Sequence, residues 1–280
     1  MSYVNPLIRK WKSGQPTLGA WLTQPDPSLA EYMAACGFDE VCADQQHSTI
    51  DVNDLAAMFM AIETRGSVAT TRVGFNDPFL IGKSLDLGAQ MVIIPMVNNA
   101  AEAARAVRAF HYSNAGVRSA GPVRPQYTMG DRPSDLEKAA CVVMVETKAG
   151  LANVDEIAAT PGVDAIYIGP GDLALGLDMD WDSSAWTASQ ERTHAEAVET
   201  IRKACERHGV TPGIHVGNAA QSARYVEQGF RLLTIASDMG LIAAGRTSID
   251  IVRKAVPPGR KGGGKSGGRA GKGRSPKTPI

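Results

Sequence analysis

The sequence predicts a (β/α)8 barrel, in which eight parallel strands form a closed ring and a helix follows each strand. Two observations favour this fold. Short runs of consecutive apolar residues, each the length of a buried strand, recur along the chain. Segments with a helical spacing of apolar residues separate these runs, so that eight strand candidates alternate with eight helix candidates. A doubly wound open sheet is the alternative, but the count of eight pairs favours the barrel.

The individual elements follow from this alternation. The strongest strand candidates are 68–73, 91–96, 142–146, 165–168 and 232–236, and weaker candidates are 18–23, 40–43 and 211–216. The helix candidates are 28–35, 52–63, 78–87, 100–110, 151–159, 186–208, 219–228 and 239–256. Glycines follow several of these helices, which is typical of a helix end that leads into a strand.

Composition indicates a soluble globular protein without a membrane segment. The chain has 280 residues, 44% of them hydrophobic, which suits one large domain. No apolar run approaches the length of a spanning helix, and the N-terminal segment lacks the layout of a signal peptide. The four cysteines are scattered without a CxxC pair, which indicates reduced core thiols and a cytoplasmic location.

A basic, glycine-rich segment occupies residues 257–280. It contains seven Lys and Arg and no Asp or Glu, and the rest of the chain then has 22 basic against 29 acidic residues. A body with a formal charge of −7 argues against specific nucleic-acid binding. The segment has no apolar face that could offset the entropy of ordering, so we expect it to be disordered. The predicted domains are therefore a barrel over 1–256 and a disordered tail over 257–280.

Chemically useful side chains lie at the ends of the predicted strands. They are Trp21 in the first strand, Asp44 and His47 at the second, Arg72 at the third, Glu146 at the fifth, Gly171 and Asp172 after the sixth, and His215 in the seventh. Because active sites of such barrels lie where the carboxyl ends of the strands meet, we expect these residues to share one pocket.

Two carboxylates on adjacent strands, Glu146 and Asp172, are the predicted metal ligands. A pair of oxygen ligands suits Mg²⁺ or Mn²⁺, with Co²⁺ or Zn²⁺ as alternatives, and leaves positions open for substrate oxygens. The other interpretation is a pair of acids held in salt bridges. The segment Gly169-Pro170-Gly171-Asp172 is predicted to be a turn whose backbone N–H groups receive a substrate carboxylate.

Three further residues have both a functional and a structural interpretation. Arg72 is either a fixed cation beside developing negative charge or an ion-pair partner of Asp44 or Asp86. His47 is either a general acid or base near neutral pH or a structural histidine. His215 is expected to line the pocket, either as a binding residue or as an inert wall.

The longest stretch without clear periodicity spans residues 112–135. Long loops in compact domains are often functional. Because this segment comes after the predicted fourth strand, we expect it on the carboxyl-terminal face of the barrel, beside the pocket.

The order of several motifs resembles that of the HpcH/HpaI aldolases. The motifs are Asp44-Gln45-Gln46-His47, Arg72, the segment GAQMVIIPMV that begins at Gly88, Val145-Glu146-Thr147, and the segment IGPGDLA that begins at Ile168. The two longer segments are quite specific when they occur together. The resemblance covers residues 18–252, which is nearly the whole predicted barrel.

The resemblance implies a metal-dependent pyruvate aldolase, for which 4-hydroxy-2-oxoheptanedioate aldolase is the type activity. It implies that Glu146 and Asp172 hold the metal and that Arg72 stabilises the enolate. It also implies that His47, supported by Asp86, moves protons. The substrates would be pyruvate or oxaloacetate and an aldehyde.

The remaining implied roles concern binding and assembly. Trp21 would wall the pocket, Asp44 would act near the aldehyde, and the N–H groups of Gly171 and Asp172 would meet the substrate carboxylate. The barrels would pack as a homohexamer with active sites near the subunit interfaces. One departure is Gln46, where the type members carry a glutamate. The absence of a lysine at a strand end disfavours a Schiff-base mechanism.

Two other hypotheses stay open at this point. The first is a related carbon–carbon lyase or synthase that uses oxaloacetate or an acyl-CoA partner on the same enolate. The second is a non-catalytic barrel that binds a small acid. The second hypothesis predicts that at least one of the two metal-binding carboxylates is missing, whereas Glu146 and Asp172 are both present.

Overall fold

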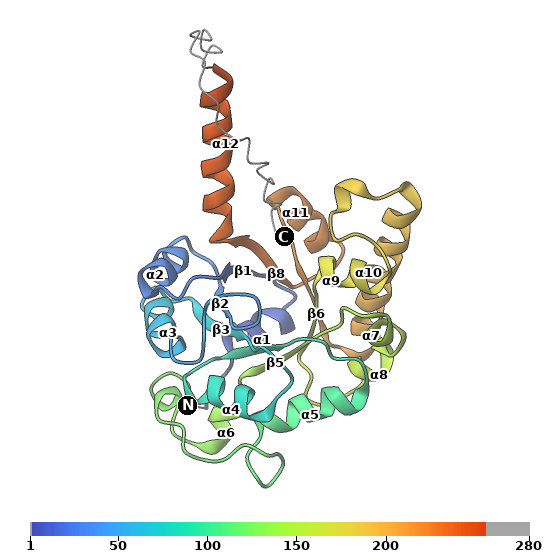
Figure 1. The fold of residues 1–280 in the computed structure, drawn as a ribbon. Helices are drawn as coiled ribbons and strands as arrows, with labels where there is room; N and C mark the ends of the chain where they lie inside the picture. The colour runs from blue at the N-terminus through green and yellow to red at the C-terminus, as the bar shows by residue number, and fades with distance from the viewer. Residues whose placement is uncertain (1, 256–280) are drawn as a thin grey trace, which may run out of the picture. The chain divides into compact units, whose positions relative to one another are not determined.

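The computed structural model describes residues 2–255 and divides the chain into two units, Met1–Asp238 and Met239–Ile280. The first unit is a closed barrel of parallel strands in the order β1 to β8 (Figure 1), which confirms the predicted fold and excludes the open sheet. In the second unit the described residues form α12 (Met239–Ala255), which is the predicted eighth helix. The predicted tail at 257–280 lies outside the described residues, so the boundary at residue 256 stays a prediction.

All eight predicted strands are present, and their ends differ from the predicted ones by no more than two residues. The strands are β1 (Thr17–Leu22), β2 (Glu40–Asp44), β3 (Val68–Arg72), β4 (Met91–Ile94), β5 (Ala140–Met144), β6 (Ala165–Ile168), β7 (Thr211–His215) and β8 (Leu232–Ser237). The register places Asp44 beside Arg72 on β2 and β3, and His215 beside Thr234 on β7 and β8. Residues that alternate along each strand therefore meet either inside the barrel or under the helices.

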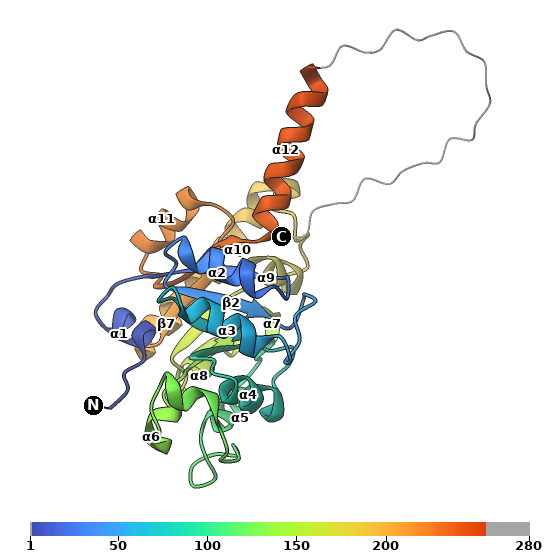
Figure 2. The same cartoon turned by 90° about the vertical axis from the view of Figure 1, so that its left-hand side faces the viewer.

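The helices that follow the strands are also close to their predicted positions. The helices of the first unit are α1 (Pro6–Lys12), α2 (Pro27–Ala35), α3 (Leu55–Glu63), α4 (Pro78–Asp86), α5 (Ala100–Phe110), α6 (Pro133–Leu136), α7 (Lys148–Ala152), α8 (Val154–Ala158), α9 (Pro170–Gly176), α10 (Ala188–His208) and α11 (Ala219–Glu227), with 3₁₀ turns η1 (Arg124–Tyr127) and η2 (Ser183–Ala185). The predicted helix at 151–159 forms as α7 and α8, and the short helices α1, α6 and α9 were not predicted. In the turned view α2 and α3 lie side by side (Figure 2), in agreement with their contacts.

Local sequence explains where several of these helices begin. The side chain of Asp26 accepts a hydrogen bond from the N–H of Ser28 at 2.7 Å, and that of Asp77 accepts one from Phe79 at 2.8 Å. A proline follows each of these caps, in the first helical position where its missing N–H costs nothing. The caps therefore set where the chain turns back from the barrel mouth after β1 and β3.

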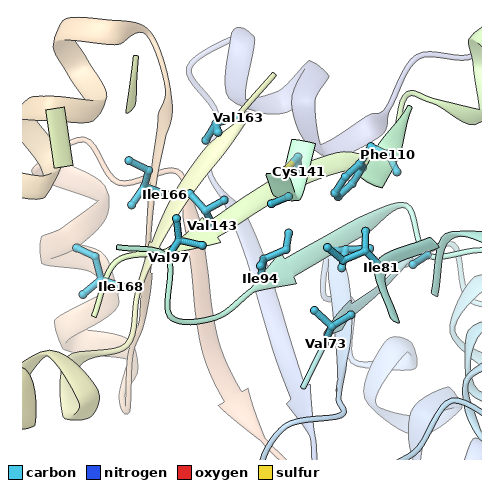
Figure 3. Packing of buried hydrophobic residues seen from close by; sticks show 14 of the residues in the cluster. Val73, Ile81, Ile94, Val97, Phe110, Cys141, Val143, Val163, Ile166 and Ile168 are labelled. Atoms are coloured by element: carbon cyan, nitrogen blue, oxygen red, sulfur yellow. The ribbon is translucent and has the colours of Figure 1, made fainter. Parts of the chain in front are cut away.

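The core consists of an inner and an outer layer. The inner cluster fills the barrel, and α1 contributes Leu7 and Trp11 to it. The outer cluster lies between strands and helices, and Figure 3 shows part of it around Ile94, Val143 and Ile166 of β4, β5 and β6. The barrel is thus a packed body and not a pore, which leaves the strand ends as the place for a site.

The long loop at 112–135 does not lie where we predicted it. It follows α5 and not β4, so it connects a helix to β5 at the amino-terminal end of the strands. Its Arg118 donates to Asp86 Oδ1 at 2.8 Å, at the end of α4, and its Arg124 donates to the carbonyl of Leu87 at 3.0 Å. The placement on the carboxyl-terminal face was wrong because the helical segment at 100–110 reverses the chain first.

Two further expectations concern membranes and cysteines. Within residues 2–255 no helix is long and apolar enough to cross a membrane. The four cysteines are all free, and Cys42, Cys141 and Cys205 are buried as expected. Cys36 is exposed at the end of α2, so the expectation of a core thiol was wrong for this residue.

Candidate active site

The carboxyl ends of the strands bring most of the predicted residues to one mouth of the barrel. Asp44, Arg72 and His215 are the last residues of β2, β3 and β7. Glu146 follows the end of β5 by two residues, and Asp172 lies in the first turn of α9 directly after β6. All strands run in the same direction, so these side chains lie around the same opening.

Arg72 and Asp44 form a two-point ion pair. The Arg72 Nε donates to Asp44 Oδ1 at 2.8 Å, and Nη2 donates to Oδ2 at 2.7 Å. Burial acts to raise the pKa of Asp44, but the hydrogen bonds and charge of Arg72 outweigh it and hold that pKa below its usual value. The ion-pair interpretation of Arg72 is therefore confirmed with Asp44 as the partner. The same pair holds a fixed cation at the barrel mouth.

Aromatic side chains line the space beside this ion pair. The Arg72 guanidinium carbon lies 4.9 Å from the centre of the Trp21 ring, in a cation–π arrangement. Trp21 stacks on Tyr167 with ring centres 6.1 Å apart, and the ring of His215 meets Trp21 edge-on at 5.4 Å. The structure thus brings the predicted Trp21, Arg72 and His215 together.

Glu146 and Asp172 face the same small space. A methyl group placed on Gly169 would lie 3.0 Å from Glu146 Oε2 and 3.3 Å from Asp172 Oδ2. The other oxygen of Glu146 accepts a hydrogen bond from the backbone N–H of Met96 at 2.8 Å. Burial first, and then the negative charge of Asp172, raise the pKa of Glu146 to about 7 against the lowering effect of the Met96 hydrogen bond.

This carboxylate pair fits a divalent cation. Two acids share one space, and burial penalises the charge of Glu146, so a cation between them would stabilise the ionised form. Among residues 2–255 no group of three His, Cys, Asp or Glu side chains is arranged to hold a metal ion. A site of two carboxylates leaves its remaining positions to water and substrate oxygens, as Mg²⁺ and Mn²⁺ sites commonly do.

The segment from Gly169 to Asp172, which we predicted to be a turn, is the start of α9. Gly169 is the N-cap, and the first intrahelical hydrogen bond runs from the N–H of Leu173 to the carbonyl of Gly169 at 2.9 Å. The N–H groups of Gly171 and Asp172 precede this bond and have no partner within the helix. They remain suitable donors for a substrate carboxylate.

The structure of one chain does not bring His47 and Asp86 together. The side chain of His47 is exposed after β2, and its backbone N–H donates to Asp44 Oδ2 at 3.4 Å. Asp86 is the last residue of α4 and pairs with Arg118 at 2.8 Å. Because α4 runs back from the mouth toward the start of β4, Asp86 lies near the opposite end of the barrel.

Gln46, the departure from the type motif, is bonded to Asp44 at the barrel mouth. Its backbone N–H donates to Asp44 Oδ1 at 3.0 Å. Its side-chain Oε1 is buried and has no hydrogen-bond partner among the described residues. An acceptor of this kind is suited to a water or substrate donor at the pocket.

Two residues of the site were missed by sequence reasoning. Tyr167 Oη donates to Thr234 Oγ1 at 2.6 Å and lies 3.3 Å from His215 Nδ1. Alternation along the strands was the signal that could have found them, because Tyr167 is two residues before Gly169 and therefore faces inward with it. Thr234 is two residues after Leu232, which belongs to the inner cluster, so Thr234 faces inward as well.

Comparisons with known proteins agree over the whole barrel. The profile of the HpcH/HpaI aldolase/citrate lyase family matches residues 17–244. A hydroxypyruvate/pyruvate aldolase of Rhizorhabdus wittichii is 37% identical over 243 residues, which are 86% of this chain and 95% of that protein. A 4-hydroxy-2-oxo-heptane-1,7-dioate aldolase of Klebsiella pneumoniae is 34% identical over 85% of this chain and 89% of its own length. The crystal structure of a Burkholderia cenocepacia protein of this family superposes with a TM-score of 0.78 at 33% identity, covering 89% of this chain and 100% of that one.

Proposed function

Because the chain belongs to the HpcH/HpaI aldolase/citrate lyase family, as its motifs indicated, we propose that it is a divalent-metal-dependent aldolase. It makes or cleaves 4-hydroxy-2-oxo acids through the enolate of pyruvate, or of a related 2-oxo acid such as oxaloacetate, and an aldehyde. The observation that carries this proposal is the convergence of the buried Arg72 guanidinium with the Glu146–Asp172 pair at one barrel mouth. The charge of Arg72 contributes, as the smallest of the causes, to lowering the pKa of Glu146, which supports their proximity.

In this proposal Glu146 and Asp172 hold Mg²⁺ or Mn²⁺, with Co²⁺ or Zn²⁺ as alternatives. When bound, the ion supplies a Lewis acid for the oxo group of the 2-oxo acid. The N–H groups of Gly171 and Asp172 receive the carboxylate of the same molecule. Trp21 and His215 form the wall beside it, where they exclude water from the reacting carbon.

Arg72 stabilises the negative charge that develops on the oxo oxygen when the adjacent carbon loses a proton. Asp44 holds the guanidinium in place before the substrate binds, so little reorganisation is needed during the reaction. We also assign Asp44 a role near the aldehyde, as the resemblance implies. His47 is the proposed acid or base that transfers the proton.

A second subunit completes the proposed site. One chain keeps His47 and Asp86 apart, so the predicted support of His47 by Asp86 requires a neighbouring copy. This requirement agrees with the homohexamer that the resemblance implies. We also propose a cytoplasmic location, which the four free cysteines support.

The relatives suggest which 2-oxo acids to test. The Rhizorhabdus wittichii relative is named for hydroxypyruvate as well as pyruvate. The relative from Klebsiella pneumoniae is named for a seven-carbon 4-hydroxy-2-oxo diacid. We therefore propose pyruvate and hydroxypyruvate as donors, and we leave the aldehyde to a panel.

Proton exchange at the donor carbon tests the proposal without any assumption about the aldehyde. Pyruvate is incubated with the protein in D2O, and loss of the methyl proton signal is followed with Mg²⁺ and then with excess EDTA. We expect exchange that needs the ion and that is lost in Asp172→Asn. The control Asp178→Asn changes an exposed acid that pairs with Lys148, and it should exchange like the unaltered protein. Absence of exchange with Mg²⁺, Mn²⁺, Co²⁺ and Zn²⁺ alike would contradict the proposal.

A further inference from the structure

The ring of His215 is held on the pocket wall by two neighbours. Its Nδ1 lies 3.3 Å from Tyr167 Oη, and its plane stands at 81° to the ring of Trp21. Gly213 leaves space for Tyr167, because a Cβ at that position would lie 2.9 Å from Tyr167 Cδ2. The local sequence Gly213-Ile214-His215 thus places a small residue under the tyrosine and the imidazole beside it.

The hydroxyl hydrogen of Tyr167 is directed to Thr234. Tyr167 Oη donates to Thr234 Oγ1 at 2.6 Å, and both residues are buried. A phenol carries one proton, so toward His215 the oxygen of Tyr167 can act only as an acceptor. With the hydroxyl hydrogen of Tyr167 directed to Thr234, the Nδ1 of His215 carries the hydrogen that fills the 3.3 Å contact.

The surroundings of His215 favour its neutral form. Burial first, and then the positive charge of Arg72, lower the pKa of His215 to about 4 against the opposing effect of Asp44. A neutral imidazole has one N–H, and with that proton on Nδ1 the Nε2 atom is a hydrogen-bond acceptor. No described residue forms a hydrogen bond with Nε2, and the side chain is partly exposed.

The other charged groups of the pocket are already paired or have another proposed role. Arg72 offers only donors, and Asp44 is occupied by Arg72. Glu146 and Asp172 are assigned to the cation under the proposed function. The neutral Nε2 of His215 is thus an acceptor that suits an uncharged hydroxyl group of a bound molecule.

We propose that His215 Nε2 accepts a hydrogen bond from a substrate hydroxyl group next to a reacting carbon, and that Tyr167 and Thr234 are positioning residues which fix its tautomer. This assignment rests on the proposed function and adds to it the residue that selects hydroxylated substrates. The hydroxyl group belongs either to a 3-hydroxy-2-oxo acid donor or to a 2-hydroxyaldehyde acceptor. Loss of such a hydrogen bond leaves a polar group unpaired, so it discriminates strongly against the analogue without the hydroxyl group.

The tautomer is tested first, because this measurement does not need catalysis. Solid-state NMR of protein with ¹⁵N-labelled histidine distinguishes protonated from unprotonated ring nitrogens, and His215→Leu assigns the signals. We expect a protonated Nδ1 and an unprotonated Nε2 in the unaltered protein. In Thr234→Val the hydroxyl of Tyr167 is free to donate to Nδ1, so the proton should move to Nε2. A protonated Nε2 in the unaltered protein would overturn the inference.

Substrate preference is tested with two matched pairs. The rate of proton exchange is compared for hydroxypyruvate and pyruvate, and the rate of aldol formation for glycolaldehyde and acetaldehyde. We expect His215→Leu to lower one of these two rate ratios by about 10- to 100-fold. Thr234→Val should lower the same ratio by a smaller factor because the ring stays in place with the wrong nitrogen protonated. The control His208→Leu, at the end of α10, should leave both ratios unchanged.

The outcomes separate this inference from the proposed function. A fall in the donor ratio alone assigns the hydroxyl group to the 2-oxo acid, and a fall in the aldehyde ratio alone assigns it to the aldehyde. Unchanged ratios in His215→Leu would overturn the inference while leaving the aldolase in place. If the unaltered protein turned over no substrate, the proposed function would fail. The ratio of the Kd values for hydroxypyruvate and pyruvate would then decide the role of His215.

Discussion

The guanidinium of Arg72 meets the carboxylate of Asp44 through its Nε and Nη2, with two hydrogen bonds of 2.8 and 2.7 Å between them. The two residues are register partners at the ends of neighbouring strands, so backbone pairing as well as charge holds them together. Trp21 covers the guanidinium at 4.9 Å. The cation is therefore oriented before any substrate binds, and the N–H groups not used by Asp44 are left for a substrate oxygen.

Arg72→Lys tests this orientation because it keeps the charge and loses the planar, two-point contact. We expect kcat/KM for pyruvate proton exchange to fall by about 10²- to 10³-fold. The control Arg65→Lys alters an exposed ion pair with Glu31 and should leave kcat/KM unchanged. Equal rates in Arg72→Lys and the unaltered protein would show that charge alone is sufficient.

Much of this site could be predicted because barrel topology brings strand ends together. Asp44, Arg72 and His215 were predicted from their positions at the ends of apolar runs, and the structure places them at one mouth. The separation of these residues along the chain does not affect the prediction, because the last residue of every parallel strand lies at the same end of the barrel. The eight strands themselves were predictable because each is a short buried run.

The parts that could not be predicted depend on contacts between distant segments or on chain direction. The contact of Tyr167 with Thr234 joins residues 67 positions apart, and neither residue type is unusual in a core. The resemblance implies that Asp86 supports His47, yet its place at the end of α4 directs it to Arg118 within one chain. The left-handed backbone of Met96, with φ of 57°, directs its N–H to Glu146 and has no signature in a non-glycine residue.

Gly169→Ala tests the shared space between the two carboxylates. The added methyl group would lie 3.0 Å from Glu146 Oε2 and 3.3 Å from Asp172 Oδ2, so it should displace at least one of them. We expect the Kd for Mn²⁺, measured by calorimetry, to rise by about 10-fold or more, comparable to loss of a group that orients metal ligands. Gly82→Ala, in open space on α4, is the control and should bind Mn²⁺ normally. An unchanged Kd in Gly169→Ala would place the ion elsewhere.

Arg118 is expected to anchor the long loop at 112–135. Its guanidinium is buried, donates to Asp86 and to the carbonyl of Leu136 at 3.0 Å, and lies 4.9 Å from the centre of the Tyr112 ring. Arg118→Leu should lower the free energy of unfolding by about 2–4 kcal/mol, because several buried or half-buried groups lose their partner. Urea unfolding measures this change, and Arg207→Leu, in an exposed pair with Asp155, should cost much less. Equal losses in the two variants would rule out the anchoring role.

Because Glu40 is buried, we expect an unusual dependence of the free energy of unfolding on pH. Its carboxyl group is buried inside the barrel, where Thr70 Oγ1 donates to it at 2.5 Å and where a Cβ on Gly19 would overlap it. Burial raises the pKa of Glu40 to about 8, so the folded chain keeps a proton that the unfolded chain releases above its ordinary value of 4.5. Stability from this group is therefore complete at low pH and is lost as the pH rises toward 8. Glu40→Gln removes the titration, and we expect it to raise the free energy of unfolding by on the order of 3 kcal/mol at pH 7 and by much less at pH 5. Urea unfolding at both pH values measures this change, and the exposed Glu196→Gln is the control. If the gain in the free energy of unfolding from Glu40→Gln were no greater at pH 7 than at pH 5, the carboxyl group of Glu40 would not be neutral in the folded chain.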